Sequence, residues 1–169
     1  MINSAKIDQS LAQEMSADIE QIIKKSQDAC ISTGTKLTTK RKNVLAVLLG
    51  SSIPLSAYEV AERYKTQFKE SLPVMSVYRM LDFLIQKKLA HKLETAAGQY
   101  MPCAHIACGH QHETPQFLIC DRCGSVKEVG IKKRIIEELE SSIQSTGFTL
   151  THKQLELHGI CEHCQGSLV

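Results

Sequence analysis

Two pairs of cysteines with the same spacing constrain this chain more than any other feature of its sequence. Cys120 and Cys123 form one C-x-x-C motif, and Cys161 and Cys164 form another, with 37 residues between the two motifs. A tight turn brings both sulfurs of such a pair toward one ion, and four thiolates complete the closed tetrahedral shell of structural zinc. The spacing therefore predicts a structural Zn²⁺ site that ties the end of the chain to an earlier turn and stabilises a small domain.

The composition fits a cytosolic protein with two small domains. The chain has 169 residues, of which 43% are hydrophobic and 22% charged, and it contains seven Cys and seven His but no Trp. Such a length allows one or two modest cores but no large enzyme barrel. No apolar run reaches the roughly 20 residues of a membrane span, and the first residues lack the apolar region of a signal peptide. In the cytosol, paired cysteines are more typical of metal or redox sites than of disulfides.

A second group of candidate ligands lies near the middle of the chain. The ten residues 103–112 contain two Cys and three His, more than a loop needs for packing or solubility. These ligand types suit zinc better than Mg²⁺ or Ca²⁺. We expect the second metal site to use His91, Cys103, His112 and Glu128, with His105, Cys108, His110 and His152 as competing ligands. A site shared by two domains changes their relative orientation when it fills, as a sensor requires.

The first half of the chain has the pattern of a winged helix. Apolar spacing predicts one helix from Ile7 to near Gly34 and a second from Thr38 or Thr39 to Gly50. A third helix begins at Ser56, because a Glu follows three residues later in a capping-box pattern. A fourth is expected over residues 76–88. Two short strands around residues 95–98 then predict a β-hairpin.

The basic residues of this half predict contact with a polyanion. Residues 36–95 contain 11 Lys and Arg but only 5 Asp and Glu. Arg41 lies in a run of three cations at the start of the second helix, where a phosphate would relieve their conflict with the helix dipole. On the fourth helix, Tyr78 and Arg79 lie away from the apolar stripe of Val77 and Leu81. A guanidinium there can donate two hydrogen bonds to a guanine in the major groove.

The second half is expected to be a small α+β unit. Short strands are predicted over 117–119 and 126–129, followed by a helix over 131–143. A last strand is expected from Phe148 toward His158. Its apolar positions change parity, which predicts a bulge or break near His152. The whole chain is therefore expected to be α+β, with a winged-helix domain over residues 1–96 and a metal-binding domain over 97–169.

Several motifs together resemble the ferric uptake regulator family of metal-responsive repressors. They are Ser76-Val77-Tyr78-Arg79, Leu81-Asp82-Phe83-Leu84, Ala90-His91-Lys92, the run from Phe117 to Gly124 and the run from Leu157 to Cys161. The resemblance covers about residues 20–165 and is strongest to the zinc-uptake branch of the family. Residues 1–18 extend beyond the part that matches.

This resemblance implies both an architecture and a function. Members of the family are dimers with an N-terminal winged helix and a C-terminal α/β dimerisation domain, and they bind operator DNA when loaded with metal. By resemblance, Tyr78 and Arg79 lie on the recognition helix. The chain would be a cytoplasmic repressor of zinc-uptake genes with zinc as co-repressor, and no enzyme. The run 103–112 is slightly longer than the family pattern, which leaves the choice between His110 and His112 open.

Other functions remain as alternatives. A relative that senses iron, manganese, nickel or peroxide would share the fold and the DNA contacts, although Cys103 favours zinc over harder ions. A different class is a thiol redox switch in which the C-x-x-C pairs release zinc on oxidation. A zinc hydrolase or deaminase is disfavoured, because the deaminase signature is absent and four thiolates leave no open metal position.

Overall fold

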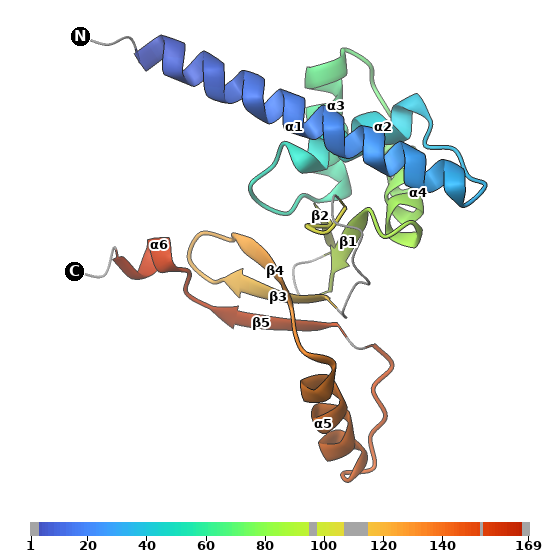
Figure 1. Ribbon diagram of the computed structural model, residues 1–169, viewed down its shortest axis with the longest axis vertical. Coiled ribbons are helices and arrows are strands. Elements are labelled where there is room, and N and C mark those ends of the chain that lie inside the picture. Colours follow the sequence, from blue (N-terminus) through green and yellow to red (C-terminus); the bar gives the residue numbers. More distant parts are fainter. Residues whose placement is uncertain (1–3, 95–97, 107–114, 153, 167–169) are drawn as a thin grey trace.

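The computed structural model describes residues 4–94, 98–106, 115–152 and 154–166, with side chains from residue 17 onward (Figure 1). Its first half is helical. The helices are α1 (Ser4–Ser32), α2 (Thr39–Leu49), α3 (Ala57–Phe68) and α4 (Val74–Gln86). Candidates Cys108, His110 and His112 lie outside the described residues.

The helices pack around one apolar core. Each helix presents residues at three- and four-residue spacing to this core, as an amphipathic helix does. Tyr64 of α3 is the largest of its fully buried side chains, and Cys30 of α1 is buried there as a small apolar group. The other members include Val44, Leu45 and Leu48 of α2, Val60 of α3, and Val77, Leu81 and Leu84 of α4. The core fixes the orientation of α4 and therefore of its exposed face.

The helix ends show which sequence signals were informative. The capping box of α3 is confirmed, since Ser56 Oγ accepts from the Glu59 N–H and the Glu59 carboxylate accepts from the Ser56 N–H. Thr38 is the N-cap residue of α2, but its side chain makes no capping hydrogen bond. Helix α4 begins at Val74, two residues earlier than predicted, directly after Pro73, whose ψ of 135° lies outside the helical range.

A two-stranded hairpin, here called the wing, follows α4. Strand β1 (Ala90–Leu93) pairs antiparallel with β2 (Gln99–Pro102). Tyr100 of β2 also forms a bridge with Leu55, which attaches the wing to the helices. The expected boundary between residues 96 and 97 therefore divides a paired hairpin. We propose that the first domain continues to the end of β2.

A three-stranded sheet forms the second half. Strands β3 (Pro115–Cys120), β4 (Val126–Gly130) and β5 (Leu155–Gly159) have the order β4-β3-β5, with β3 antiparallel to β4 and parallel to β5. Helix α5 (Lys133–Gln144) provides the crossover, and α6 (Glu162–Gln165) follows β5. The α+β class and the order of winged helix and α/β unit are confirmed.

The long last strand predicted from Phe148 is wrong in its first part. Residues 148–152 form no strand, and Phe148 is 72% exposed. Pairing begins only at Leu155, so the change of parity near His152 marks where the strand starts rather than a bulge within it. A parallel crossover needs connecting chain, and these residues supply it.

The wing lies between the helices and the three-stranded sheet (Figure 1). His91 of β1 packs against Phe117 of β3, with the ring centroids 5.2 Å apart and the ring planes tilted by 59°. Among the described residues no helix is both long enough and apolar enough to cross a membrane. The junction between wing and sheet is where the second group of candidate ligands meets.

Candidate metal sites and nucleic-acid interface

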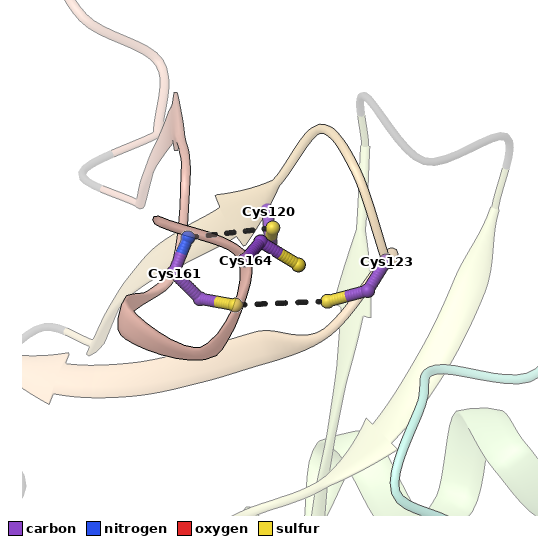
Figure 2. Close-up of side chains that lie close together, drawn as sticks. All are labelled: Cys120, Cys123, Cys161 and Cys164. Carbon is purple, nitrogen blue, oxygen red and sulfur yellow. Dashed lines mark hydrogen bonds between the residues drawn. The ribbon is translucent and has the colours of Figure 1, made fainter. Parts of the chain in front are cut away.

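The four cysteines of the C-x-x-C pairs converge at one end of the three-stranded sheet (Figure 2). Cys120 ends β3 and Cys123 lies in the turn toward β4, while Cys161 is the N-cap residue of α6 and Cys164 lies within that helix. Gly124 has φ 69°, a left-handed conformation that glycine adopts without strain, and it lets the turn close after Cys123. All four sulfurs lie within 4.8 Å of one another.

The spacing of these sulfurs fits a tetrahedral zinc ion. Cys123 Sγ and Cys161 Sγ are 3.7 Å apart. A Zn–S bond of about 2.3 Å in a tetrahedral shell gives a sulfur–sulfur edge of about 3.8 Å. A disulfide would need about 2.05 Å, and the described cysteines form none. Two matched pairs at this distance could hold a metal ion in a shell of four thiolates, without the open position that catalysis needs.

The local electrostatics also favour a bound cation. Backbone N–H groups, that of Cys161 above all, lower the pKa of Cys120 to about 6. In contrast, the pKa of Cys164 is raised to about 12 by its hydrogen bond with Cys161, by burial and by its crowded sulfur neighbours. Four thiols at this distance cannot all ionise without a positive charge among them. A divalent ion supplies that charge, because thiolate is the form that binds metal.

A second cluster lies at the junction of the wing and the sheet. His91 lies in β1, Cys103 directly follows β2, and Glu128 lies in β4. One ligand atom from each lies within 4.8 Å of the others. His91 Nε2 is 3.4 Å and Cys103 Sγ is 3.9 Å from Glu128 Oε1. Three of the four preferred ligands therefore come together from two different parts of the fold.

His91 provides the observation that most directly indicates a metal at this junction. Its Nε2 is buried and has no hydrogen-bond partner among the described residues, although it faces the Glu128 carboxylate. A buried ring nitrogen that lies 3.4 Å from a carboxylate without a hydrogen bond to it is available to a metal ion, which accepts its lone pair. The donor set of imidazole, thiolate and carboxylate suits zinc.

Glu128 is charged at this junction. Burial raises its pKa, but contacts with His91, the Ala104 N–H and His105 outweigh burial and lower the pKa to about 2. The Ala104 N–H donates to Oε2 at 2.7 Å. The carboxylate is therefore ready to bind a cation at any physiological pH.

The competing ligands separate into different places. His105 Nδ1 lies 3.0 Å from Glu128 Oε1, beside the cluster, but its ring nitrogens are not within 4.8 Å of both other ligand atoms. His152 is exposed and lines a different hollow with Glu94 and Glu156. From the sequence we preferred His112 to His105 as a ligand. The contact with Glu128, which the sequence does not show, is what makes His105 a candidate.

The basic face lies where α2 meets α4. A hollow of about 540 Å³ is lined by Thr38, Thr39, Lys40, Arg41, Ser76, Arg79 and Met80. Arg79 is exposed, as expected of a side chain that reads DNA, whereas Tyr78 is half-buried and packs against the helical core. The prediction that Tyr78 belongs wholly to the outward face is therefore too simple.

The three adjacent cations of α2 have different surroundings. The Arg41 guanidinium stacks 3.6 Å above the Phe83 ring and donates to the Lys36 carbonyl. Lys40 Nζ is 2.6 Å from the Glu70 carboxylate. Lys42 points toward α1 instead, where it donates to Gln27 at 3.4 Å. Arg41 and Lys40 therefore face the hollow together with Arg79.

Sequence reasoning missed the hydroxyl groups and the acid at this face. Thr38, Thr39 and Ser76 line the hollow beside the cations, and hydroxyls are common phosphate contacts. Glu70 precedes α4 and has no sequence pattern of its own. The only available signal for the threonines was their position at the start of a helix.

Known proteins are similar to this chain in sequence. The ferric uptake regulator family model matches residues 32–158. The zinc uptake regulation protein of Escherichia coli is 30% identical over 145 residues, covering 86% of this chain and 82% of that protein. The peroxide-responsive repressor PerR of Staphylococcus saprophyticus is 26% identical, covering 89% of this chain and 99% of its own.

A solved structure of a zinc uptake regulator in complex with zinc and DNA has the same fold. It superposes with a TM-score of 0.76 at 27% identity, covering 88% of this chain and 96% of that one. The family match extends from the end of α1 into β5 and includes His91, Cys103 and Glu128 of the junction. The chain therefore belongs to the ferric uptake regulator family, whose members are metal-responsive DNA-binding transcription regulators and not enzymes.

Proposed function

We propose that this chain is a zinc-responsive repressor of zinc-uptake genes, with zinc as its co-repressor. The observation that carries the proposal is the convergence of His91, Cys103 and Glu128 at the junction between wing and sheet. The ligands come from both sides of the junction, so a bound ion would hold the DNA-binding domain in one orientation. The regulators of zinc uptake that this chain resembles support the same function.

The ligand chemistry supports zinc over other metals. Iron(II) and manganese(II) sites in proteins favour carboxylate and imidazole ligands, whereas a thiolate favours zinc. Cys103 Sγ is buried beside His91 and Glu128. We propose His91, Cys103 and Glu128 as three ligands of the regulatory zinc. His105 is the described candidate for the fourth, and His112 or His110 stays a prediction.

The second zinc is proposed to be structural. Cys120, Cys123, Cys161 and Cys164 would hold it and stay loaded when the regulatory zinc leaves. The closed shell of thiolates supports this role, since it leaves no position for exchange with substrate or solvent.

The proposed partner is double-stranded operator DNA, bound in the cytoplasm by a homodimer. Arg79 would contact base edges from α4, with Tyr78 contributing from its half-buried position. Arg41 would contact the phosphate backbone at the start of α2. The hollow between these helices supports that arrangement, because cations and hydroxyls from both sides face it. The dimer would place two such faces on successive turns of the major groove.

Linkage defines how zinc would act. If zinc binds the DNA-competent arrangement more tightly, it raises DNA affinity by the same factor by which DNA raises zinc affinity. The test is a titration of operator binding against buffered free zinc with the full chain. We expect operator affinity to rise steeply with zinc in the wild type. At the same free zinc concentration, His91→Ala and Cys103→Ser should bind operator at least about tenfold more weakly than the wild type.

A matched control keeps this test specific. His152→Ala is the same substitution as His91→Ala at an exposed histidine that lines the hollow with Glu94 and Glu156 and not the metal cluster, and its zinc affinity should equal that of the wild type. His105→Ala should have an intermediate effect if His105 is the fourth ligand. Operator binding that is indifferent to zinc in the wild type would refute the proposal.

Peroxide sensing is the second candidate, because PerR is also similar to this chain. The same titration with iron or manganese, followed by hydrogen peroxide, distinguishes it. A zinc-responsive repressor binds operator DNA when zinc fills the junction, and its DNA affinity does not fall when peroxide is added. Loss of zinc from the four cysteines on oxidation would instead favour a thiol redox switch, which the lowered pKa of Cys120 would assist.

A further inference from the structure

A closed network of hydrogen bonds joins the wing to strand β5. The Gln154 side-chain amide donates to the Lys92 carbonyl at 3.0 Å and to Glu156 Oε1 at 2.8 Å. The same carboxylate oxygen accepts from the Glu94 N–H at 2.7 Å. Both side chains, one just before β5 and one within it, thus contact backbone groups at the end of β1 and directly after it, 62 residues earlier in the chain. We call Gln154 and Glu156 the interdomain latch.

The geometry of the latch follows from the periodicity of strands. Residues two apart in an extended chain point to the same side, so Gln154 and Glu156 face the wing together. The carbonyl of Lys92 and the N–H of Glu94 lie on one edge of β1, because the carbonyl of a residue and the N–H two residues on point the same way. The two side chains therefore pair with this edge as a neighbouring strand would.

The latch and the metal cluster hold the wing at opposite edges of the sheet. The strand order is β4-β3-β5, so the two outer strands are β4 and β5. Glu128 of β4 binds the Ala104 N–H and faces His91, whereas the latch extends from β5. One attachment leaves a body able to pivot about that point. Two attachments on opposite edges fix its orientation.

We propose that Gln154 and Glu156 are positioning residues that convert a filled junction site into one fixed orientation of the DNA-binding domain. This inference rests on the proposed function. Without the latch, His91, Cys103 and Glu128 still hold their metal, but the wing and the helices attached to it rotate about that site. The DNA-binding domain of the zinc-loaded protein then populates several orientations. Operator affinity falls because only one of them binds DNA.

The test compares Gln154→Ala and Glu156→Ala with wild type in the full-length protein. Zinc content per chain and operator affinity are measured at saturating buffered zinc. Charge-assisted hydrogen bonds of this kind predict roughly tenfold weaker operator binding for Glu156→Ala. We expect unchanged zinc content. The matched control is Glu94→Ala, which removes a carboxylate beside the latch but keeps the Glu94 backbone N–H that the latch uses. It also releases Lys92 Nζ, 3.8 Å from that carboxylate, so its operator affinity should be at or above the wild-type value and not below it.

A conservative variant separates positioning from a merely structural role. Glu156→Gln keeps an oxygen that accepts from the Glu94 N–H, and it should recover most of the operator affinity that Glu156→Ala loses. The inference is overturned if Gln154→Ala and Glu156→Ala bind operator like wild type at saturating zinc. It is also overturned if both lose zinc in proportion to DNA affinity, which would indicate misfolding. If the operator affinity of the wild type does not depend on zinc, the proposed function is refuted and not this inference alone.

Discussion

At the scale of the residue, one carboxylate organises the junction. Glu128 accepts the Ala104 N–H, contacts His105 and lies beside His91 and Cys103. Its pKa is about 2 because these contacts outweigh the effect of burial. The stabilisation from its charged form is therefore fully present above about pH 4.3, the pKa of an unperturbed Glu, and is lost only as the pH falls toward 2.

This pKa gives the first prediction. Glu128→Gln removes the charge and should weaken zinc binding at the junction by at least about tenfold. Competition with a chelator at pH 7 measures the zinc affinity of both proteins. A zinc affinity equal to that of the wild type would show that Glu128 does not bind the metal.

The second prediction concerns Glu70, which forms an ion pair with Lys40 on the proposed DNA-binding face. Lys40 Nζ lies 2.6 Å from its carboxylate, and the Tyr64 hydroxyl donates to the same side chain at 3.2 Å. Glu70→Gln keeps an acceptor for Tyr64 but frees Lys40 to neutralise a phosphate. Operator affinity should rise, and the slope of log affinity against log salt should steepen by about 1.

The control for Glu70 is Glu20→Gln, which makes the same charge change on the exposed surface of α1. It should leave the salt slope unchanged. If Glu70→Gln has the slope of the wild type, Lys40 does not approach the phosphate backbone.

Single residues could be predicted where a pattern marked them. The density of ligands over 103–112 pointed to Cys103, and the C-x-x-C spacing pointed to all four thiols. Glu70, Gln154 and Glu156 could not be found in this way, because each acts through a partner far away in the sequence. Only the packing of the helices and the sheet brings those partners together.

At the scale of the element, the capping box of α3 provides the third prediction. Ser56 Oγ and the Glu59 carboxylate satisfy each other's backbone N–H groups. Ser56→Ala should lower the free energy of unfolding by about 1 kcal/mol, since an N–H at the start of the helix loses its acceptor. Urea unfolding followed by helical circular dichroism measures the change. A difference within experimental error would show that the box contributes nothing.

The same element has a pH dependence of known sign. Hydrogen bonds from Ser56 lower the pKa of Glu59. Its stabilisation is therefore present above the unfolded pKa of about 4.3 and is lost as the pH falls through the lower folded value. Glu59→Gln should be less stable than wild type at pH 7, and the gap should shrink at pH 3. Zinc loss at low pH affects both proteins and cancels in the comparison.

Elements with local signals were the ones that sequence analysis placed correctly. The Ser56 cap and the apolar stripes located the helices to within a few residues. The last strand was misplaced because alternation around Phe148 resembles a strand, although no neighbour pairs there. Pairing with β3 selects Leu155–Gly159, and that choice depends on a parallel partner nearly 40 residues away.

At the scale of the whole molecule, the two halves differ in what stabilises them. The helices and wing share one continuous apolar core. Among the described residues of the second half, few apolar side chains are buried, chiefly Phe117, Ile119 and Ile136. A domain with so small a core needs a metal or a partner to fold.

Metal removal is the fourth prediction. Stripping both zinc sites with a chelator under reducing conditions should expose the amides of β3, β4 and β5 to hydrogen exchange while α2, α3 and α4 stay protected. Cys164→Ser should behave in the same way without a chelator. Protection of the sheet that persists without metal would show that the four cysteines are not a folding site.

The most direct test of the central claim measures operator affinity and bound zinc together as zinc is added to the metal-free protein. The account predicts that the first equivalent per chain fills the four-cysteine site and leaves operator affinity low. The second equivalent should fill the junction and raise the affinity, and Cys103→Ser should abolish this second step alone. High operator affinity after the first equivalent, or a wild type that binds equally well after complete chelation, would contradict the account.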